Sequence, residues 1–375
     1  MLQSRQAVTV SGAALIYRLL FELVLRRIPA ETAHSIAARS AAVLARIPLV
    51  SRALAPREPR LEVRALGLTF PSPLGAAAGV DKDAAWFDGL AALGFGYVEV
   101  GTVTAVPQDG NPKPRVFRVP AARALVNSMG FPNAGAEATA ARLRSRTGRT
   151  IVGANVGKSK SASLERAVDD YRTSVRQVAP HAAYLALNVS SPNTPGLREM
   201  QAVERLEALV VGVRDELRTI GVALPLLVKI APDLSDDAID AIADLAVRHR
   251  LDGVIAVNTT VSRDGLDSPV AERPGGVSGA PLKRRALEVL RRLAAKVDEG
   301  VVLISVGGIE GPDDAWDRIL AGATLVQAYT GFVYGGPFWP RRVNRRLAAR
   351  VSASGAASVQ DLVGTGAHRL AGFAR

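Results

Sequence analysis

The chain has 375 residues, 48% hydrophobic and 22% charged, and no cysteine. This composition excludes a disordered or collagen-like chain, a disulfide scaffold, a cysteine-ligated metal or cluster, and a cysteine nucleophile. The net charge is +12, and residues 1–60, with nine arginines against three glutamates, carry half of that excess. Because the remaining residues are nearly balanced, we expect a distinct N-terminal module and no nucleic-acid partner.

The N-terminal module is predicted to contain two short helices. Residues 15–24 place their apolar side chains on one helical face and charged side chains on the other, and Pro29 ends this helix. The second helix is predicted over residues 31–47 and ends at Pro48. The pair could be a lid packed on the main domain, but arginines beside a strongly apolar face favour helices that lie on anionic lipid. No apolar stretch is long enough to predict a transmembrane span.

The chain after residue 70 contains eight short apolar runs, most of them separated by helical patterns such as 164–178 and 202–217. Such alternation is typical of parallel strands buried by helices. A doubly wound sheet is the alternative, but eight units in about 270 residues fit a (β/α)8 TIM barrel better. The predicted strands are Leu74–Val80, Tyr97–Val103, Ile151–Val156, Tyr184–Ser190, Leu226–Ala231, Gly253–Asn258, Val302–Val306 and Leu325–Tyr329.

The connection between the second and third predicted strands is unusually long. Residues 104–133 contain prolines and arginines, and we interpret them as a hairpin inserted over the mouth of the barrel. The predicted organisation is therefore a helical module over residues 1–60, an α/β barrel over 61–350, and a small, polar C-terminal tail over 351–375 with no assigned role.

Three predicted strands, the third, fourth and sixth, end in asparagine: Asn155, Asn188 and Asn258. Catalytic groups of such barrels lie at the C-terminal ends of the strands. One asparagine at a strand end is more often a turn former, but three in equivalent positions favour a binding role. Planar amides suit a flat ring with alternating C=O and N–H groups, such as a pyrimidine or a flavin.

Lysine is rare in this chain, since 40 of its 47 cationic residues are arginine. Lys82 follows the first predicted strand, and Lys229 lies inside the apolar fifth strand. A lysine in such a strand needs a counter-charge, and we expect a bound anionic or electron-rich ring to supply it.

Glycine-rich turns at 275–279, 307–308 and 331 predict a phosphate site near the seventh and eighth strands. The segment 153–159 is similar to a P-loop but is one residue too short, and no Gly-x-Gly-x-x-Gly follows a strand. Together the residues predict a barrel that binds a small planar substrate and a phosphate-bearing planar cofactor, for which FMN is best suited. No metal site is expected.

Ser191 lies in the polar loop 188–196, which contains two prolines. It could act as a base or as a nucleophile. Because no Gly-x-Ser-x-Gly motif surrounds it and no histidine is near in sequence, acyl-transfer chemistry is poorly supported.

In these motifs the sequence resembles class 2 dihydroorotate dehydrogenases, the membrane-associated, quinone-reducing enzymes of pyrimidine biosynthesis. The resemblance extends over about residues 15–345. The motifs that carry it are Ala77–Asp83, Gly101–Val103, Asn127–Asn133, Asn188–Gly196, Val228–Leu234, Asn258–Thr260, Gly275–Gly279, Ser305–Ile309 and Tyr329–Phe332.

The resemblance implies oxidation of (S)-dihydroorotate to orotate, with hydride transfer to one FMN per chain and reoxidation of the flavin by a membrane quinone. It implies that Ser191 is the base that removes the C5 proton. The implied substrate residues are Lys82, Asn127, Ser128, Met129, Gly130, Phe131, Asn188, Asn193, Asn258 and Thr259. The implied FMN residues are Ala78, Gly79, Val80, Asp81, Lys82, Thr102, Asn155, Asn188, Lys229, Val257, Gly279, Gly308, Tyr329 and Thr330, with Lys229 near flavin N1 and O2.

The resemblance also implies a monomeric, peripheral protein on the cytoplasmic face of the cell membrane, with quinone entering between the N-terminal helices. Class 1 relatives use a cysteine base, and this chain has no cysteine. Serine is a weak base, so its surroundings must activate it, through a water path or through Thr194.

The sequence departs from the family pattern at Ser128 and Pro132, in the segment that commonly reads Asn-Arg-Met-Gly-Phe-Asn-Asn, and at Val257, where threonine is common. A lost hydroxyl contact at Val257 would cost roughly 1 kcal/mol. Two alternatives therefore stay open. One is a flavin barrel that acts on another dihydropyrimidine or another acceptor. The other is a non-enzymatic basic protein that binds nucleic acid or membrane.

Overall fold

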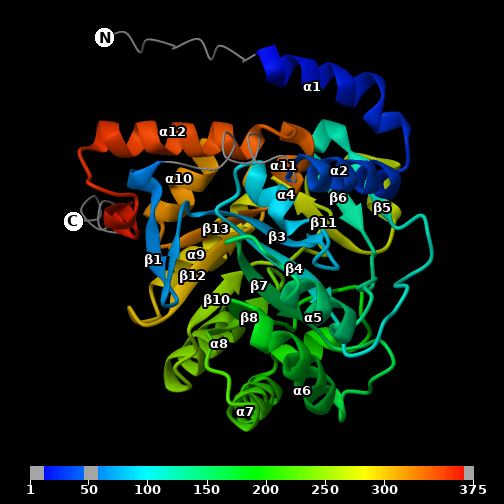
Figure 1. Cartoon of the computed structure of the whole chain (residues 1–375), viewed down its shortest axis with the longest axis vertical. Coiled ribbons are helices and arrows are strands. Elements are labelled where there is room, and N and C mark those ends of the chain that lie inside the picture. The colour runs from blue at the N-terminus through cyan, green and yellow to red at the C-terminus, as the bar shows by residue number, and fades with distance from the viewer. Residues whose placement is uncertain (1–11, 46–57, 367–375) are drawn as a thin grey trace.

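The computed structural model describes residues 12–45 and 58–366, and its centre is a closed barrel of eight parallel strands (Figure 1). The strands follow one another around the barrel in the order β10-β12-β13-β3-β4-β7-β8-β9. This confirms the predicted (β/α)8 barrel. The strands are β3 (Leu74–Asp81), β4 (Tyr97–Val103), β7 (Ile151–Val156), β8 (Tyr184–Asn188), β9 (Leu226–Ile230), β10 (Gly253–Ala256), β12 (Val302–Val306) and β13 (Leu325–Ala328).

Two tyrosines fill the interior of the barrel, and glycines on neighbouring strands make room for them. A Cβ at Gly75 would lie 2.4 Å from the ring of Tyr97, and one at Gly153 would lie 2.0 Å from the ring of Tyr184. Both tyrosines are fully buried. The barrel is therefore a packed core, and its space for a ligand lies at the mouth.

Helices cover the outside of the barrel and bury their apolar faces against it. The helices predicted over residues 164–178 and 202–217 are both present. The first begins later than predicted, at Ala167, and the second runs from Val203 to Thr219. The helices are α4 (Phe87–Ala92), α5 (Ala136–Arg144), α6 (Ala167–Val178), α7 (Val203–Thr219), α8 (Asp236–Arg248), α9 (Lys283–Ala294), α10 (Pro312–Leu320), α11 (Thr330–Gly335) and α12 (Trp339–Ser354). Short 3-10 helices lie at Pro59–Leu61, Pro120–Ala122, Ala179–His181, Leu197–Gln201, Pro269–Glu272, Ala280–Leu282 and Gln360–Leu362.

The predicted hairpin is present as β5 (Val116–Val119) and β6 (Ala124–Asn127). A third antiparallel strand, β11 (Gly276–Gly279), pairs with β6. The glycine cluster that was predicted as a phosphate cradle is therefore mostly a strand. Its glycines fit because the chains approach closely: a Cβ at Gly276 would lie 2.0 Å from Thr259 Oγ1.

The N-terminal module consists of α1 (Gly12–Leu23), a 3-10 turn (Leu25–Arg27) and α2 (Ala30–Ala45). Both helices agree with the prediction, although the expected end of the second, at Ile47 and Pro48, falls outside the described residues. Helix α1 packs on α11, and α2 packs on α4 and β5. None of the described helices has both the length and the apolar character needed to cross a bilayer.

The C-terminal segment differs from the expected polar tail. Helix α12 continues to Ser354, and Val351 and Val359 are buried. The backbone N–H of Val359 donates to Arg60 O (2.8 Å), beside the short hairpin β1 (Val63–Ala65) and β2 (Leu68–Phe70). The sequence gives little indication of this packing, because residues after 351 are mostly small and include few large apolar side chains.

Candidate active site

A pocket opens at the carboxyl ends of the barrel strands and is roofed by the β5–β6 hairpin. It brings together most of the predicted residues, from segments between Ala77 and Gly331. The predicted residues that line it are Ala78, Gly79, Lys82, Thr102, Asn127, Met129, Gly130, Phe131, Asn188, Ser191, Asn193, Lys229, Val257, Asn258, Thr259, Gly279, Gly308, Tyr329 and Thr330.

Four predicted residues lie outside this pocket, each for a local reason. Val80 points into a neighbouring apolar cavity. The Asp81 carboxylate accepts the backbone N–H groups of Ala85 and Trp86, both at 2.9 Å, and so holds the turn after β3. Ser128 lines a separate outer hollow. Asn155 is fully buried behind the wall of the pocket.

Lys229 reaches the floor of the pocket from β9 and is paired with a residue of β4. Its Nζ lies 3.4 Å from Glu99 Oε1, and both side chains are almost completely buried. Glu99 also accepts hydrogen bonds from Asn155 Nδ2 (2.9 Å), Gln327 Nε2 (2.8 Å) and the Tyr184 hydroxyl (3.2 Å). Burial, and then the charge of Glu99, raise the pKa of Tyr184 well above its usual value. The protein itself therefore supplies the counter-charge that was predicted to come from a ligand.

The three strand-end asparagines form one hydrogen-bonded chain around the mouth. Thr102 Oγ1 donates to Asn155 Oδ1 (2.6 Å), and Asn188 Nδ2 donates to Thr102 Oγ1 (2.8 Å). Asn258 Nδ2 donates to Asn188 Oδ1 (3.4 Å) and to Ser190 Oγ (3.0 Å). The prediction that these amides share one mouth is confirmed, but Asn155 supports its neighbours and does not face the pocket.

Ser191 is buried in the pocket wall, on the loop after β8. Its Oγ accepts the backbone N–H of Asn193 (3.2 Å), and it is 5% exposed. Thr194, in the same loop, has a buried hydroxyl with no hydrogen-bond partner among the described residues. This loop therefore holds two hydroxyl groups close in sequence, one of them facing the pocket.

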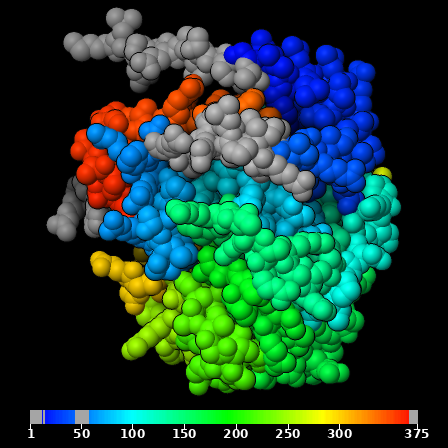
Figure 2. Space-filling view, in the orientation of Figure 1, coloured from blue at the N-terminus to red at the C-terminus, as the bar shows by residue number. Residues whose placement is uncertain are grey.

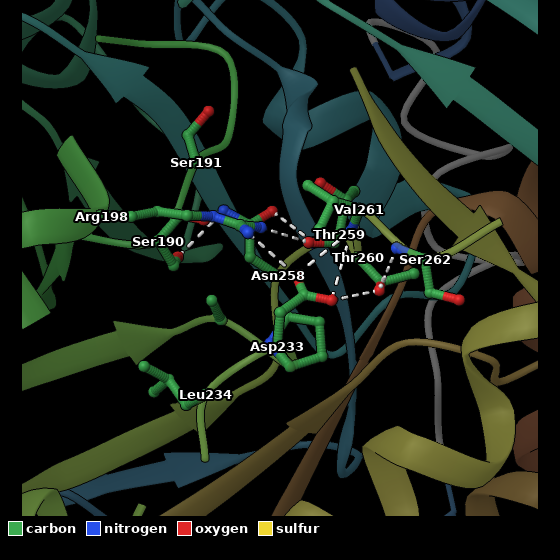
Figure 3. A network of polar contacts seen from close by, with 12 residues as sticks. Ser190, Ser191, Arg198, Asp233, Leu234, Asn258, Thr259, Thr260, Val261 and Ser262 are labelled. Carbon is green, nitrogen blue, oxygen red and sulfur yellow. Dashed lines mark hydrogen bonds and ion pairs between the residues drawn. The ribbon is translucent and has the colours of Figure 1, made fainter. Parts of the chain in front are cut away.

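Arg198 fixes the Ser191 loop to two other loops (Figure 3). Its guanidinium donates to Ser190 O (3.1 Å) and Thr259 O (3.0 Å), and it pairs with Asp233 at 2.9 Å. Asp233 in turn accepts the hydroxyl of Thr260. In Figure 3 the Ser191 side chain points away from this ion pair. The network thus holds the backbone of the loops at Ser190 and Thr259 and makes no contact with the Ser191 hydroxyl.

The hairpin contributes Asn127, which faces Asn193 of the Ser191 loop. Asn193 Nδ2 donates to Asn127 O (3.2 Å) and Oδ1 (3.3 Å). The following turn has Gly130 and Phe131 in the left-handed region, at φ 68° and 53°. Asn133 Nδ2 holds this turn by donating to Phe131 O (2.8 Å). The turn therefore closes over the pocket with proline at position 132.

Lys82 lies at the opposite wall, on the turn after β3. Its Nζ donates to Gly79 O (2.8 Å). Burial lowers the pKa of Lys82 to about 8, although the charges of Glu31 and Asp81 act in the other direction. This lysine is therefore a cation whose charge depends on pH in the neutral to mildly alkaline range.

One end of the pocket is built from tight glycine backbones. A Cβ at Gly308 would lie 2.3 Å from Lys283 Cα, and a Cβ at Gly279 would lie 2.2 Å from Arg123 O. The other end has the Lys229 ammonium and the buried Gln327 Oε1, which has no hydrogen-bond partner among the described residues. Closely packed glycine backbones at one end fit the phosphate of FMN, and the Lys229 ammonium with the unsatisfied Gln327 Oε1 at the other end fits the polar edge of its flavin ring.

A second, apolar cavity lies between the N-terminal helices and the barrel. Tyr17, Phe21, Phe332 and Phe338 are among its lining residues, and Val116, Leu125 and Tyr329 line both this cavity and the pocket. The two spaces therefore share a wall. This sharing places an apolar site directly beside the polar one.

Among the residues that the structure describes, His34 is the one histidine on the wall of the apolar cavity, and its ring lies 5.6 Å from that of Trp86. Burial, together with the charge of Lys82, lowers its pKa to about 3. His34 is therefore neutral at physiological pH. Arg118 also lines the cavity and donates to Ile28 O (2.9 Å).

Sequence reasoning missed several of these residues. Glu99 and Gln327 are polar residues inside buried strands, and the argument used for Lys229 applies equally to them. Arg198, Asp233 and His34 lie in ordinary loops or helices, where no local pattern distinguishes them from surface residues.

Comparisons with known proteins agree with this geometry. The sequence model of the family described as dihydroorotate dehydrogenase matches residues 60–351. The chain is 55% identical over 363 residues to a dihydroorotate dehydrogenase (quinone) of Thermobifida fusca, covering 93% of this chain and 96% of that one. It is 54% identical to one of Streptomyces coelicolor, covering 93% and 98%. A crystal structure of Eimeria tenella DHODH in complex with ferulenol superposes with a TM-score of 0.83 at 36% identity, covering 94% of this chain and 98% of that one.

Proposed function

The chain belongs to the dihydroorotate dehydrogenase family, and we therefore propose that its two adjoining cavities divide one reaction between them. The chain oxidises dihydroorotate to orotate in pyrimidine (UMP) biosynthesis and uses a quinone as electron acceptor. The observation that carries the division is the shared wall of Val116, Leu125 and Tyr329 between the polar pocket and the apolar cavity.

When bound, FMN would supply the hydride acceptor of this reaction and the electrons for the quinone. We propose that the glycine backbones at 279 and 308 hold its phosphate, and that Lys229 and Asn188 hold the polar edge of its ring. Glu99 keeps the Lys229 ammonium at the floor of the pocket, 3.4 Å away. The proposed FMN residues that line the pocket are Ala78, Gly79, Lys82, Thr102, Asn188, Lys229, Val257, Gly279, Gly308, Tyr329 and Thr330.

Ser191 Oγ removes the C5 proton of the substrate in this proposal. The support for it is position: the hydroxyl is in the pocket wall, and its Oγ accepts an N–H from Asn193, which leaves the hydroxyl proton free to be donated onward. Thr194, whose buried hydroxyl has no hydrogen-bond partner among the described residues, is the candidate to receive that proton while it passes its own hydroxyl proton on to solvent water. Asn127, Asn193 and Asn258 offer amides to the substrate ring, and Lys82 offers a cation to its carboxylate.

The quinone occupies the apolar cavity in this proposal. Aromatic and aliphatic side chains suit its ring and isoprenoid tail. His34, held neutral by burial, offers a hydrogen bond to a quinone oxygen without introducing a charge. Electrons cross the wall shared with the pocket, so the quinone and the substrate never occupy the same space.

Residues 1–60 then form the membrane-associating module and residues 61–350 the FMN barrel. Exposed apolar residues on α1, such as Ile16 at 69% exposure, support peripheral association with an anionic membrane. Since quinones are dissolved in the membrane, we place the protein on the cytoplasmic face of the cell membrane. We also propose that the protein acts as a monomer.

The test is an anaerobic experiment on the purified full-length protein. Dihydroorotate is added and the flavin absorbance is followed, and a quinone is then added. We expect bleaching by dihydroorotate and recovery with the quinone, but no recovery with fumarate or NAD. A flavin that stays oxidised in folded, FMN-loaded protein would contradict the substrate assignment.

A further inference from the structure

Helix α12 carries an unusual concentration of positive charge. Its sixteen residues contain five arginines and no acidic residue. A buried stripe that includes Trp339, Val343 and Leu347 packs the helix on the barrel, so the arginines lie outside that stripe. Arg350 pairs with Asp313. The remaining charge of the helix is concentrated nearer its N-terminus.

Arg345 and Arg346 are exposed, and within residues 12–45 and 58–366 neither forms an ion pair. Burial, and then the charges of these two neighbours, lower the pKa of Arg342. Some other surface arginines do have a carboxylate partner, for example Arg205 with Glu199. The charge of Arg345 and Arg346 is thus uncompensated, which is the condition in which a charged surface attracts an anionic partner.

This charge lies at the same end of the molecule as the N-terminal helices (Figures 1 and 2). The Tyr17 hydroxyl donates to Val333 O (2.7 Å), and a Cβ at Gly336 would lie 2.4 Å from the Tyr17 ring. Helix α12 begins three residues later. Phe338, just before it, is 42% exposed and lines the apolar cavity. Helix α1 and the start of α12 therefore flank one end of that cavity.

The exposed face of α1 is strongly apolar. Leu15, Ile16, Leu19 and Leu23 are between 52% and 69% exposed. An apolar helix face beside uncompensated arginines suits the surface of an anionic bilayer, because the apolar face can contact the acyl chains while the arginines contact the headgroup phosphates. A nucleic-acid partner would account for the positive charge of α12 but not for the apolar face of α1.

We propose that α12 is a second membrane-contacting element, in which Arg345 and Arg346 bind the phosphates of anionic lipids while α1 enters the bilayer. Guanidinium groups suit this role because they bind phosphate through paired hydrogen bonds. Membrane contacts at both α1 and α12 orient the cavity opening, which Phe338 lines, toward the membrane. This inference deepens the membrane association given under Proposed function and rests on it.

The test measures co-sedimentation of full-length protein with two kinds of vesicle, phosphatidylcholine alone and phosphatidylcholine mixed equally with phosphatidylglycerol. We expect R345Q/R346Q to bind the anionic vesicles roughly tenfold or more weakly at low ionic strength, and to bind the neutral vesicles as wild type does. The matched control is R205Q/R218Q, which removes the same charge from exposed residues of α7 at the opposite end of the molecule (Figure 1).

Equal binding of R345Q/R346Q and wild type to the anionic vesicles would overturn the proposal, as would an equal loss in R205Q/R218Q. A third variant, L19D, tests the membrane role of α1 separately from that of α12, because it should lose binding to both kinds of vesicle. If L19D binds both as wild type does, the membrane role of α1 fails as well. Unchanged turnover of R345Q/R346Q with a short-chain, water-soluble quinone shows that the variant is folded.

Discussion

The interior of the barrel and the N-terminal module are built in opposite ways. Every residue of β4 is buried, and the polar Glu99 at its centre accepts three hydrogen bonds besides its ion pair. Of the α1 and α2 side chains that the structure describes, only Phe21 and Ala41 are buried. The barrel interior buries polar atoms and holds them in hydrogen bonds, whereas the N-terminal module leaves apolar side chains exposed.

The difference matches the two halves of the reaction. Proton removal and hydride transfer require groups held in a fixed geometry, which a close-packed polar network provides. A quinone with a long flexible tail requires an apolar space that opens toward lipid. The two half-reactions should therefore respond to different substitutions.

The largest effect is expected at Ser191. S191A removes the proposed base, so flavin reduction by dihydroorotate should slow by roughly 10²- to 10⁴-fold. FMN content and orotate binding should stay as in wild type, because the pocket keeps its shape. Stopped-flow absorbance measures the rate, and S262A, which lies in another loop of the same mouth, is the control. Near-normal reduction by S191A would show that another group is the base.

A large loss of stability is expected at the floor of the pocket. E99A leaves the Lys229 ammonium buried without its counter-charge, which should lower the free energy of unfolding by about 3–5 kcal/mol. Urea unfolding measures the change, and E99A/K229M should recover part of it. E288A, which removes the exposed partner of Arg284, should cost at most about 1 kcal/mol. Equal effects of E99A and E288A would contradict the stabilising role of the buried Glu99–Lys229 pair at the floor of the pocket.

A smaller and selective effect is expected in the apolar cavity. Ala37 of α2 lines this cavity, so A37W fills it and should weaken use of a long-tailed quinone roughly tenfold, equivalent to about 1.4 kcal/mol. Flavin reduction by dihydroorotate should be unchanged. The control is V43W on the same helix, at a residue that is 59% exposed and does not line the cavity. A similar loss in V43W would mean that α2 is merely disturbed.

The smallest effect is expected from the titration of Lys82. Burial lowers its pKa to about 8, so its charge is lost above that pH and substrate carboxylate binding weakens. The kcat/KM for dihydroorotate should fall by up to about tenfold per pH unit above pH 8 relative to K82M, which lacks the titration. The same titration has the opposite effect on the free energy of unfolding, which rises with pH. Since the unfolded chain keeps this proton up to about pH 10.5, the Lys82 contribution to stability rises between pH 8 and pH 10.5. An identical pH profile in K82M would remove Lys82 from substrate binding.

The sequence predicts the barrel well because its strands are continuous apolar runs. The bounds of β4, β7 and β12 agree with the prediction residue by residue, since apolar and turn residues separate sharply there. Strand β11 was missed, because its glycines are typical of a loop and its pairing with β6 is a contact about 150 residues apart in sequence.

The site was predicted where a strand end alone places a side chain in the mouth, as at Asn188 and Asn258. The sequence did not predict contacts with partners distant in sequence. Lys229 finds its counter-charge in Glu99, and Asn155 turns toward the same carboxylate. Neither contact can be inferred from spacing, because the closure of the barrel brings the strands together.

The most direct measurement compares the two half-reactions of S191A and A37W in one stopped-flow experiment. We expect S191A to be slow in flavin reduction by dihydroorotate and normal in reoxidation by a long-tailed quinone. We expect A37W to be normal in flavin reduction and slow in reoxidation. If both substitutions slowed the same half-reaction, the division of the chemistry between the two cavities would be contradicted.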